Sequence, residues 1–143
     1  MNERDEAFLR RAIELAAEAG KGGERPFGSL LVGDDGAILA EDHNTVTSER
    51  DVTAHPELKL ARWAGRELTP EAAARTTMYT SCQPCPMCAY AIDRSGLGRV
   101  VYALATDQFL ALAPAAARSS TVTYDGPALL AEAGDPIERF YPR

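Results

Sequence analysis

The first part of the chain changes from a helical spacing of apolar residues to two short apolar runs. Apolar side chains recur at helical spacing over residues 6–19, and Gly20 follows as a C-cap, which predicts a helix. Residues 27–32 and 37–42 form two apolar runs separated by Gly33-Asp34-Asp35-Gly36, a sequence typical of a hairpin turn. The pattern therefore predicts a helix followed by two antiparallel strands.

From residue 53 onward, helical and strand patterns alternate. The predicted strands cover residues 77–81, 99–105 and 121–124. The predicted helices run from an N-cap at Thr53 to about residue 66, and over residues 86–94, 107–118 and 127–133, with a break at Pro114. Helices between successive strands make those strands parallel, joined by right-handed crossovers and covered on both faces. We therefore expect residues 1–143 to form a single α/β domain, a three-layer α/β/α sandwich whose mixed five-stranded sheet has its last two strands parallel.

Two short motifs carry residue types that bind zinc. His55-Pro56-Glu57 and Pro84-Cys85-Pro86-Met87-Cys88 each stand at a predicted helix start. One imidazole and two thiolates supply three zinc ligands, and three protein ligands leave a fourth position for water. The positive end of a helix also favours the thiolate form of Cys85. The sequence predicts a zinc ion held by His55, Cys85 and Cys88, an arrangement typical of a nucleobase deaminase.

Glu57 is the candidate proton carrier of this site. It lies two residues after His55, so at the mouth of a helix one side chain can grip the metal while the other lies beside it. A carboxylate in this place can take a proton from the water and return protons to a ring nitrogen and to departing ammonia. A closed apolar pocket would raise its pKa into the useful range. We therefore expect Glu57 to be catalytic and not a ligand.

Cys82 leaves an alternative of another class open. With Cys85 and Cys88 it forms Cys-x-x-Cys-x-x-Cys, which is compatible with a closed Cys3His site and a non-catalytic structural zinc module. Against this, Cys82 ends a predicted strand on the far side of Pro84, where a small buried hydrophobic residue is the simpler interpretation. We favour the open, catalytic site.

Composition and charge restrict the partners. The 143 residues carry a formal net charge of −6, and the arginines are interspersed with acids without forming a basic stripe. Because counterion release supplies most of the affinity for nucleic acid, a nucleic-acid substrate is disfavoured. No apolar run approaches a membrane span, and the charged start has no apolar signal region. Three cysteines, two of them in the motif above, fit a reducing compartment, so we expect a cytoplasmic enzyme.

These motifs make the chain resemble the cytidine and deoxycytidylate deaminase superfamily, in the branch of guanine deaminases, yeast-type cytosine deaminases and tRNA adenosine deaminases. The resemblance runs over nearly the whole chain, through Pro26-Phe27-Gly28, Asn44, Thr53-Ala54-His55-Pro56-Glu57, Ser81-Cys82-Gln83-Pro84-Cys85-Pro86-Met87-Cys88 and Arg99-Val100-Val101-Tyr102. It implies the α/β/α sandwich, the zinc ligands and the role of Glu57 described above. It also implies a homodimer.

The resemblance further implies residues that bind the substrate. Asn44 looks like the asparagine that hydrogen-bonds the bound base, and the backbone carbonyl of Gln83 would face the leaving amine. Phe27 looks like part of the pocket wall, where a ring can stack on a base, although ordinary strand packing explains it equally well. Relatives close the pocket with C-terminal segments, so Phe140 and Tyr141 either do the same here or belong to a surface tail.

Two departures from the family pattern bear on this pocket. Pro56 stands where the family has alanine; a proline is tolerated in the first helical turn, but it removes an N–H group near the metal. Gln83 stands where the family has glutamate, which removes a negative charge. The expected reaction is hydrolytic deamination of a free nucleobase or base-like ring of the guanine, cytosine or aminotriazine type. A nucleoside deaminase or a tRNA adenosine deaminase of the same superfamily is the alternative.

Overall fold

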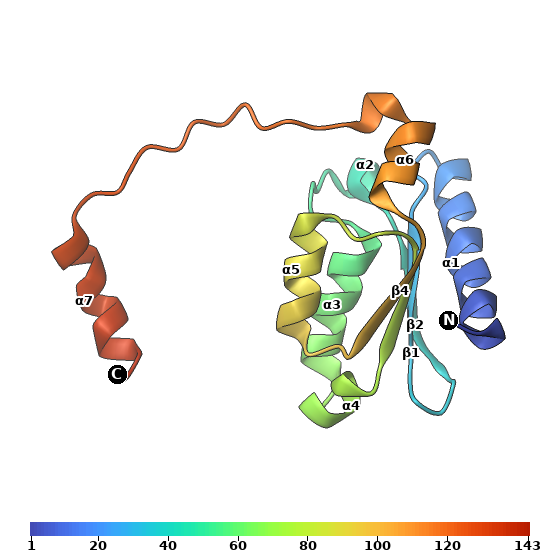
Figure 1. Ribbon diagram of the computed structural model, residues 1–143, viewed down its shortest axis with the longest axis horizontal. Helices are drawn as coiled ribbons and strands as arrows, with labels where there is room; N and C mark the ends of the chain where they lie inside the picture. Colours follow the sequence, from blue (N-terminus) through green and yellow to red (C-terminus); the bar gives the residue numbers. More distant parts are fainter.

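One mixed sheet forms the centre of the molecule (Figure 1). The computed structural model describes residues 1–143, and its strands are β1 (Gly28–Val32), β2 (Ile38–His43), β3 (Thr77–Cys82) and β4 (Arg99–Leu104), in the order β2-β1-β3-β4. β1 is antiparallel to both β2 and β3, whereas β3 and β4 are parallel. The predicted α/β class and the parallel pairing of the last strands of the sheet are confirmed.

Helices cover both faces of the sheet, as predicted for a three-layer sandwich (Figure 1). α1 (Glu3–Lys21) packs on one face, where its side of the core is formed by Leu9, Ala12, Leu15, Leu30, Val32, Tyr79 and Val101. α3 (Pro56–Glu67) and α5 (Pro86–Ser95) lie on the other face, around Leu31, Leu60, Ala61, Ala64, Met78 and Ile92. Successive residues of β1 point to opposite faces, and for this reason they divide between the two clusters.

Two short helices were not predicted from the sequence. α2 (Val46–Glu49) follows the loop after β2, and α4 (Pro70–Ala74) precedes β3. Each is shorter than two turns, and no apolar periodicity can be recognised over so few residues. The signal for α4 was its start, because Thr69 caps the backbone N–H of Ala72 and Pro70 occupies the first helical position.

Asp5 anchors α1 to the sheet. Its buried carboxylate accepts a hydrogen bond from the Tyr79 hydroxyl at 2.6 Å, and two more from the Arg99 guanidinium at 2.9 and 3.0 Å. These partners, Arg99 foremost, hold the pKa of Asp5 well below its usual range. The hydrogen bond from Tyr79 therefore links the N-terminal helix to β3, and the ion pair with Arg99 links it to β4.

Asp5→Asn is expected to lower the free energy of unfolding by about 2 kcal/mol at neutral pH, the size typical of hydrogen bonds to a charged group. A carboxyl whose pKa is lowered by folding stabilises the protein above its unfolded pKa, and the effect is lost as the pH falls toward the folded value. The difference between wild type and variant should therefore shrink below about pH 4. Urea unfolding at neutral and acidic pH measures this, with the exposed Glu3→Gln as control; equal stability at neutral pH would contradict it.

The C-terminal part of the chain leaves the body of the fold. After α6 (Thr106–Leu112) and a 3-10 helix, η1 (Pro114–Ala116), residues 117–129 run without regular structure to α7 (Leu130–Phe140), which lies apart from the other elements (Figure 1). We call residues 117–143 the C-terminal arm. The fifth strand predicted at residues 121–124 is not formed, so the sheet has four strands. A strand needs a neighbouring strand for its backbone hydrogen bonds, and the arm lies along no edge of its own sheet.

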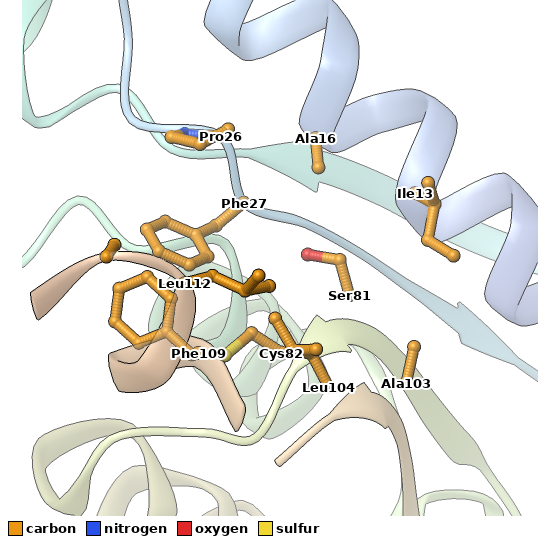
Figure 2. Close-up of a pocket in the computed structure, with 11 residues that line it drawn as sticks. Ile13, Ala16, Pro26, Phe27, Ser81, Cys82, Ala103, Leu104, Phe109 and Leu112 are labelled. Carbon is orange, nitrogen blue, oxygen red and sulfur yellow. The ribbon is translucent and has the colours of Figure 1, made fainter. Parts of the chain in front are cut away.

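An apolar groove lies open between α1, the end of β4 and α6 (Figure 2). Its volume is about 460 Å³, and nine of its 11 lining residues are hydrophobic: the lining is Ile13, Ala16, Pro26, Phe27, Ser81, Cys82, Ala103, Leu104, Phe109, Leu112 and Ala113. We call it the α1 groove. Phe27 and Phe109 meet there edge to face, with ring centroids 5.4 Å apart.

Candidate active site

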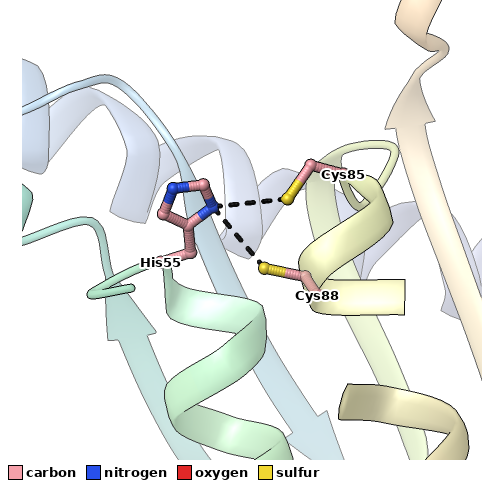
Figure 3. A group of neighbouring side chains, drawn as sticks. All are labelled: His55, Cys85 and Cys88. Atoms are coloured by element: carbon pink, nitrogen blue, oxygen red, sulfur yellow. Dashed lines mark hydrogen bonds between the residues drawn. The ribbon is translucent and has the colours of Figure 1, made fainter. Parts of the chain in front are cut away.

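The zinc-binding residues predicted from the sequence come together at the starts of two neighbouring helices (Figure 3). His55 is the N-cap of α3 and Cys85 is the N-cap of α5; Pro56 and Pro86 follow them at the first helical positions. The N-cap predicted at Thr53 thus lies two residues further along the chain. Pro56 is buried in a turn whose N–H groups have no intrahelical partner, so this departure from the family pattern leaves the helix start intact.

The distances within this group fit a zinc ion. His55 Nδ1 lies 3.6 Å from Cys85 Sγ and 3.5 Å from Cys88 Sγ, and all three ligand atoms lie within 4.8 Å of one another. Zn–N bonds of about 2.0 Å and Zn–S bonds of about 2.3 Å at tetrahedral angles place such ligands roughly 3.5–3.8 Å apart. Cys82 does not belong to the group but lines the α1 groove. The arrangement is therefore a three-ligand site, as the open alternative predicted.

The three ligand side chains shift one another's pKa values. Hydrogen bonds from Cys88 and from His55 lower the pKa of the Cys85 thiol to about 4. The same contact with Cys85, together with burial, raises the pKa of Cys88, and the bond to Cys85 raises the pKa of His55. One thiolate thus forms readily at the helix start, which is the form that binds a divalent cation.

Glu57 lies in the first turn of α3, only 6% exposed. Burial raises the pKa of its carboxyl to about 7. Ser29 Oγ approaches Glu57 Oε1 at 3.4 Å and also donates to Thr80 Oγ1 at 2.8 Å. A carboxyl with a pKa near neutrality can both accept and donate a proton. Glu57 does not belong to the group of three possible zinc ligands, so its carboxyl is free for this role.

Ser29 and Thr80 were not singled out from the sequence. They are small polar residues in the middle of the buried strands β1 and β3. Polar side chains at such positions need hydrogen-bond partners, and this is the signal that could have identified them.

Asn44 is held rigidly in the loop after β2 and is 1% exposed. Its backbone N–H donates to the Phe27 carbonyl at 3.0 Å, and its side-chain Oδ1 accepts from the Val46 N–H at 3.0 Å. The following residue is tied to the segment before His55, because the Thr45 N–H donates to the Ala54 carbonyl at 3.0 Å. Because Oδ1 already accepts a hydrogen bond, the side-chain NH2 group is the part of Asn44 that remains available, and it is a donor.

The Gln83 side chain accepts a hydrogen bond from the first residue of α6. Its Oε1 accepts from the Thr106 N–H at 3.0 Å, and its backbone N–H donates to the Leu104 carbonyl at 2.8 Å. No protein donor reaches the Gln83 carbonyl, which lies two residues before Cys85. The side chain is therefore structural, and the backbone carbonyl remains available as an acceptor.

Phe27 lines the α1 groove and also contacts the loop that carries Asn44. The zinc ligands, Glu57 and Asn44 do not line that groove. The volume of the groove is therefore not the volume of the cavity in which the reaction takes place. Phe27 reaches the groove with its ring and supports Asn44 with its carbonyl. Its partner Phe109 in α6 was not predicted from the sequence, because the contact joins residues far apart in the chain.

Comparisons with known proteins agree with this geometry. The cytidine and deoxycytidylate deaminase zinc-binding region matches residues 2–104. Guanine deaminase of Bacillus subtilis is 46% identical over 101 residues, which are 68% of this chain and 63% of the relative. A probable cytosine deaminase of Schizosaccharomyces pombe is 30% identical over 141 residues, or 96% of this chain and 83% of the relative. A tRNA-specific adenosine deaminase of Buchnera aphidicola is 37% identical over 99 residues, 69% of this chain and 65% of the relative.

Solved structures give the same result. The X-ray structure of guanine deaminase from Bacillus subtilis superposes with a TM-score of 0.79 at 33% identity, over 98% of this chain and 94% of that one. Guanine deaminase from Nitrosomonas europaea gives a TM-score of 0.63 at 26% identity, over 76% of this chain and 63% of that one.

No helix of the present structure combines the length and apolarity needed to cross a bilayer.

Proposed function

Because this chain belongs to the cytidine and deoxycytidylate deaminase zinc-binding family and is a zinc-dependent deaminase, we propose that its substrate is a free nucleobase, guanine first. The observation that carries the proposal is the three-ligand site with a buried, unliganded carboxyl of near-neutral pKa beside it. The likeness to a guanine deaminase over 98% of the chain favours that ring over the cytosine and aminotriazine types. The net charge of −6 favours a small ring over tRNA.

The reaction exchanges an amino group on a ring carbon for oxygen from water. His55, Cys85 and Cys88 would hold a zinc ion, which would supply a coordination position for water and lower the pKa of that water toward neutrality. Glu57 accepts the proton that the water gives up and passes it to the ring nitrogen next to the reacting carbon. Glu57 then carries the second water proton to the amine, which departs as ammonia. Water and the aminated ring thus become the oxo ring and ammonia.

The other proposed residues hold the ring in place for this step. The Asn44 side-chain NH2 group donates to an acceptor on the ring, and the free Gln83 carbonyl accepts from the amine that leaves. Phe27 forms one wall of the pocket, fixed by its edge-to-face contact with Phe109. A ring fixed on two edges and one face has its reacting carbon in a single orientation toward the metal.

An ammonia-release screen tests the proposal. Purified zinc-loaded protein is offered guanine, cytosine, isocytosine, adenine, ammeline and the corresponding nucleosides, with bulk tRNA as a further substrate. We expect ammonia from guanine and little from the nucleosides or tRNA. Faster release from a nucleoside or from tRNA would replace the base proposal by one of the other activities of the family.

We also propose that the protein is a homodimer whose C-terminal arms are exchanged. α7 carries large apolar side chains that are open to solvent, with Leu130 88%, Ile137 57% and Phe140 77% exposed. A helix of 11 residues without packing is marginal in water. β4 has a free outer edge, and the α1 groove beside it is uncovered. The solved guanine deaminase chain superposes over 98% of this chain, a span that must include most of the arm.

Each arm would then complete the other copy. Residues 121–124, the strand expected from the sequence, can pair with β4 of the second copy, and α7 can cover the apolar surface beside it. Phe140 and Tyr141 meet edge to face at the end of α7 and are the aromatic residues available to close the partner's pocket. Exchange of the arms thus accounts for the missing fifth strand and for the exposed helix together.

Removal of residues 118–143 is expected to convert a dimer into a monomer and to expose the α1 groove to solvent. Light scattering after size-exclusion chromatography measures the mass. The control is Arg139→Ala, because Arg139 is exposed and pairs only with Asp135 within its own helix; this variant should stay dimeric. A full-length protein that is monomeric at high concentration would rule out the exchange.

A further inference from the structure

Lys59 connects the helix of the catalytic carboxyl to the loop of Asn44. It lies two residues after Glu57 in α3, and its side chain is 18% exposed. The ammonium donates to Asp42 Oδ1 at 2.9 Å, to the His43 carbonyl at 2.9 Å and to Thr45 Oγ1 at 2.8 Å. An ammonium has three donors, and here all of them are used.

The acceptors of Lys59 surround one residue. Asp42 and His43 precede Asn44 and Thr45 follows it, so the ammonium is bonded on both sides of that asparagine, to one backbone carbonyl and two side chains. The remaining supports of the loop are the bonds from Asn44 to Phe27 and from Thr45 to Ala54. Those two bonds tie the loop to β1 and to the segment before α3, whereas Lys59 alone ties it to the body of α3.

We propose that Lys59 is a positioning residue for substrate binding: it fixes the Asn44 side chain at a set distance from Glu57 and the zinc ligands. The inference rests on the proposed role of Asn44. α3 begins at His55 and contains Glu57, so one rigid helix carries a metal ligand, the proton carrier and the lysine. Through Lys59, α3, which carries Glu57, also fixes the position of the Asn44 side chain that binds the substrate ring.

Loss of the ammonium should therefore affect binding of the ring more than the chemical step. Lys59→Met keeps an unbranched chain of similar length and removes the three bonds. Glu57 and the zinc ligands keep their own supports in α3 and α5. We expect KM for guanine to rise about tenfold and kcat to change by less than about threefold, since hydrogen bonds to a charged group contribute at this scale. Zinc content should not change.

A double-mutant cycle with Asn44→Ala separates positioning from general stability. If Lys59 acts through Asn44, Lys59→Met should raise KM about tenfold in the wild-type background and less than about twofold in the Asn44→Ala background. Where Asn44→Ala turns over too slowly, the dissociation constant of guanine from equilibrium dialysis serves in place of KM. The same rise in both backgrounds, or no rise in either, would overturn the proposal.

Matched variants complete the experiment. Lys21→Met makes the same chemical change at an exposed lysine at the end of α1 and should leave KM and kcat unaltered. If Lys59→Met does not fold, Thr45→Val removes one of the three acceptors and should raise KM about threefold; unchanged KM in that variant counts against the proposal. A wild type that deaminates no ring refutes the proposed function, whereas an active wild type with an additive cycle refutes only the role of Lys59.

Discussion

Glu57→Gln is expected to lower turnover about a thousandfold, the middle of the range for general acid–base catalysis. The amide has the same shape and can stay in the buried place beside Ser29, but it neither accepts nor returns a proton. Because Glu57 is not among the grouped ligands, the variant should bind as much zinc as the wild type. Ammonia release and zinc content, measured on the same preparation, test both parts.

The matched control for this change is Glu67→Gln, which lies in the same helix and is exposed. It should leave turnover and zinc content unaltered. Turnover of Glu57→Gln within about tenfold of the wild type would show that another group moves the protons.

Cys88→Ala is expected to remove both the zinc and the activity. Cys88 is fully buried, and its sulfur lies 3.5 Å from His55 Nδ1, so the change removes one of the three ligand atoms of the site. Two ligands remain, which is fewer than structural or catalytic zinc sites use. Elemental analysis should find little zinc per chain, and ammonia release should fall to background.

Cys82→Ala makes the same change at a second buried cysteine, outside the ligand group. It should keep its zinc and its activity and lose about 1 kcal/mol of stability through the small cavity that is left. If Cys82→Ala lost zinc as Cys88→Ala does, the site would be closed by three cysteines and a histidine, and the catalytic proposal would fail.

The zinc group could be predicted from the sequence because its geometry is local. Cys85 and Cys88 are placed by the first turn of one helix, and His55 and Glu57 by the first turn of another. Prolines mark both helix starts. Once α3 and α5 pack on the same face of the sheet, their starts lie side by side and the ligands come together with no other contact required.

The supports of the site could not be predicted in this way. Phe109 reaches Phe27 from an element 82 positions further along the chain, and Lys59 grips a loop that precedes its own helix. Such contacts depend on how elements pack, which neither periodicity nor local spacing encodes. The pair of Ser29 and Thr80 is of the same kind, because it joins two strands.

The C-terminal arm shows a different reason for a wrong prediction. The alternation of polar and apolar residues at 121–124 is typical of a strand, but a strand is a property of a pair. Within one chain the outer edge of β4 has no neighbour, and the arm lies apart from it. The pattern therefore shows that residues 121–124 can form a strand when the free edge of another strand lies beside them.

The most direct test follows the oxygen of the solvent. Zinc-loaded protein is incubated with guanine in heavy-oxygen water, and the ring product and ammonia are quantified by mass spectrometry. Hydrolytic deamination predicts xanthine that carries one heavy oxygen, formed together with an equal amount of ammonia. Guanine left unchanged by a preparation with a full complement of zinc would contradict the account.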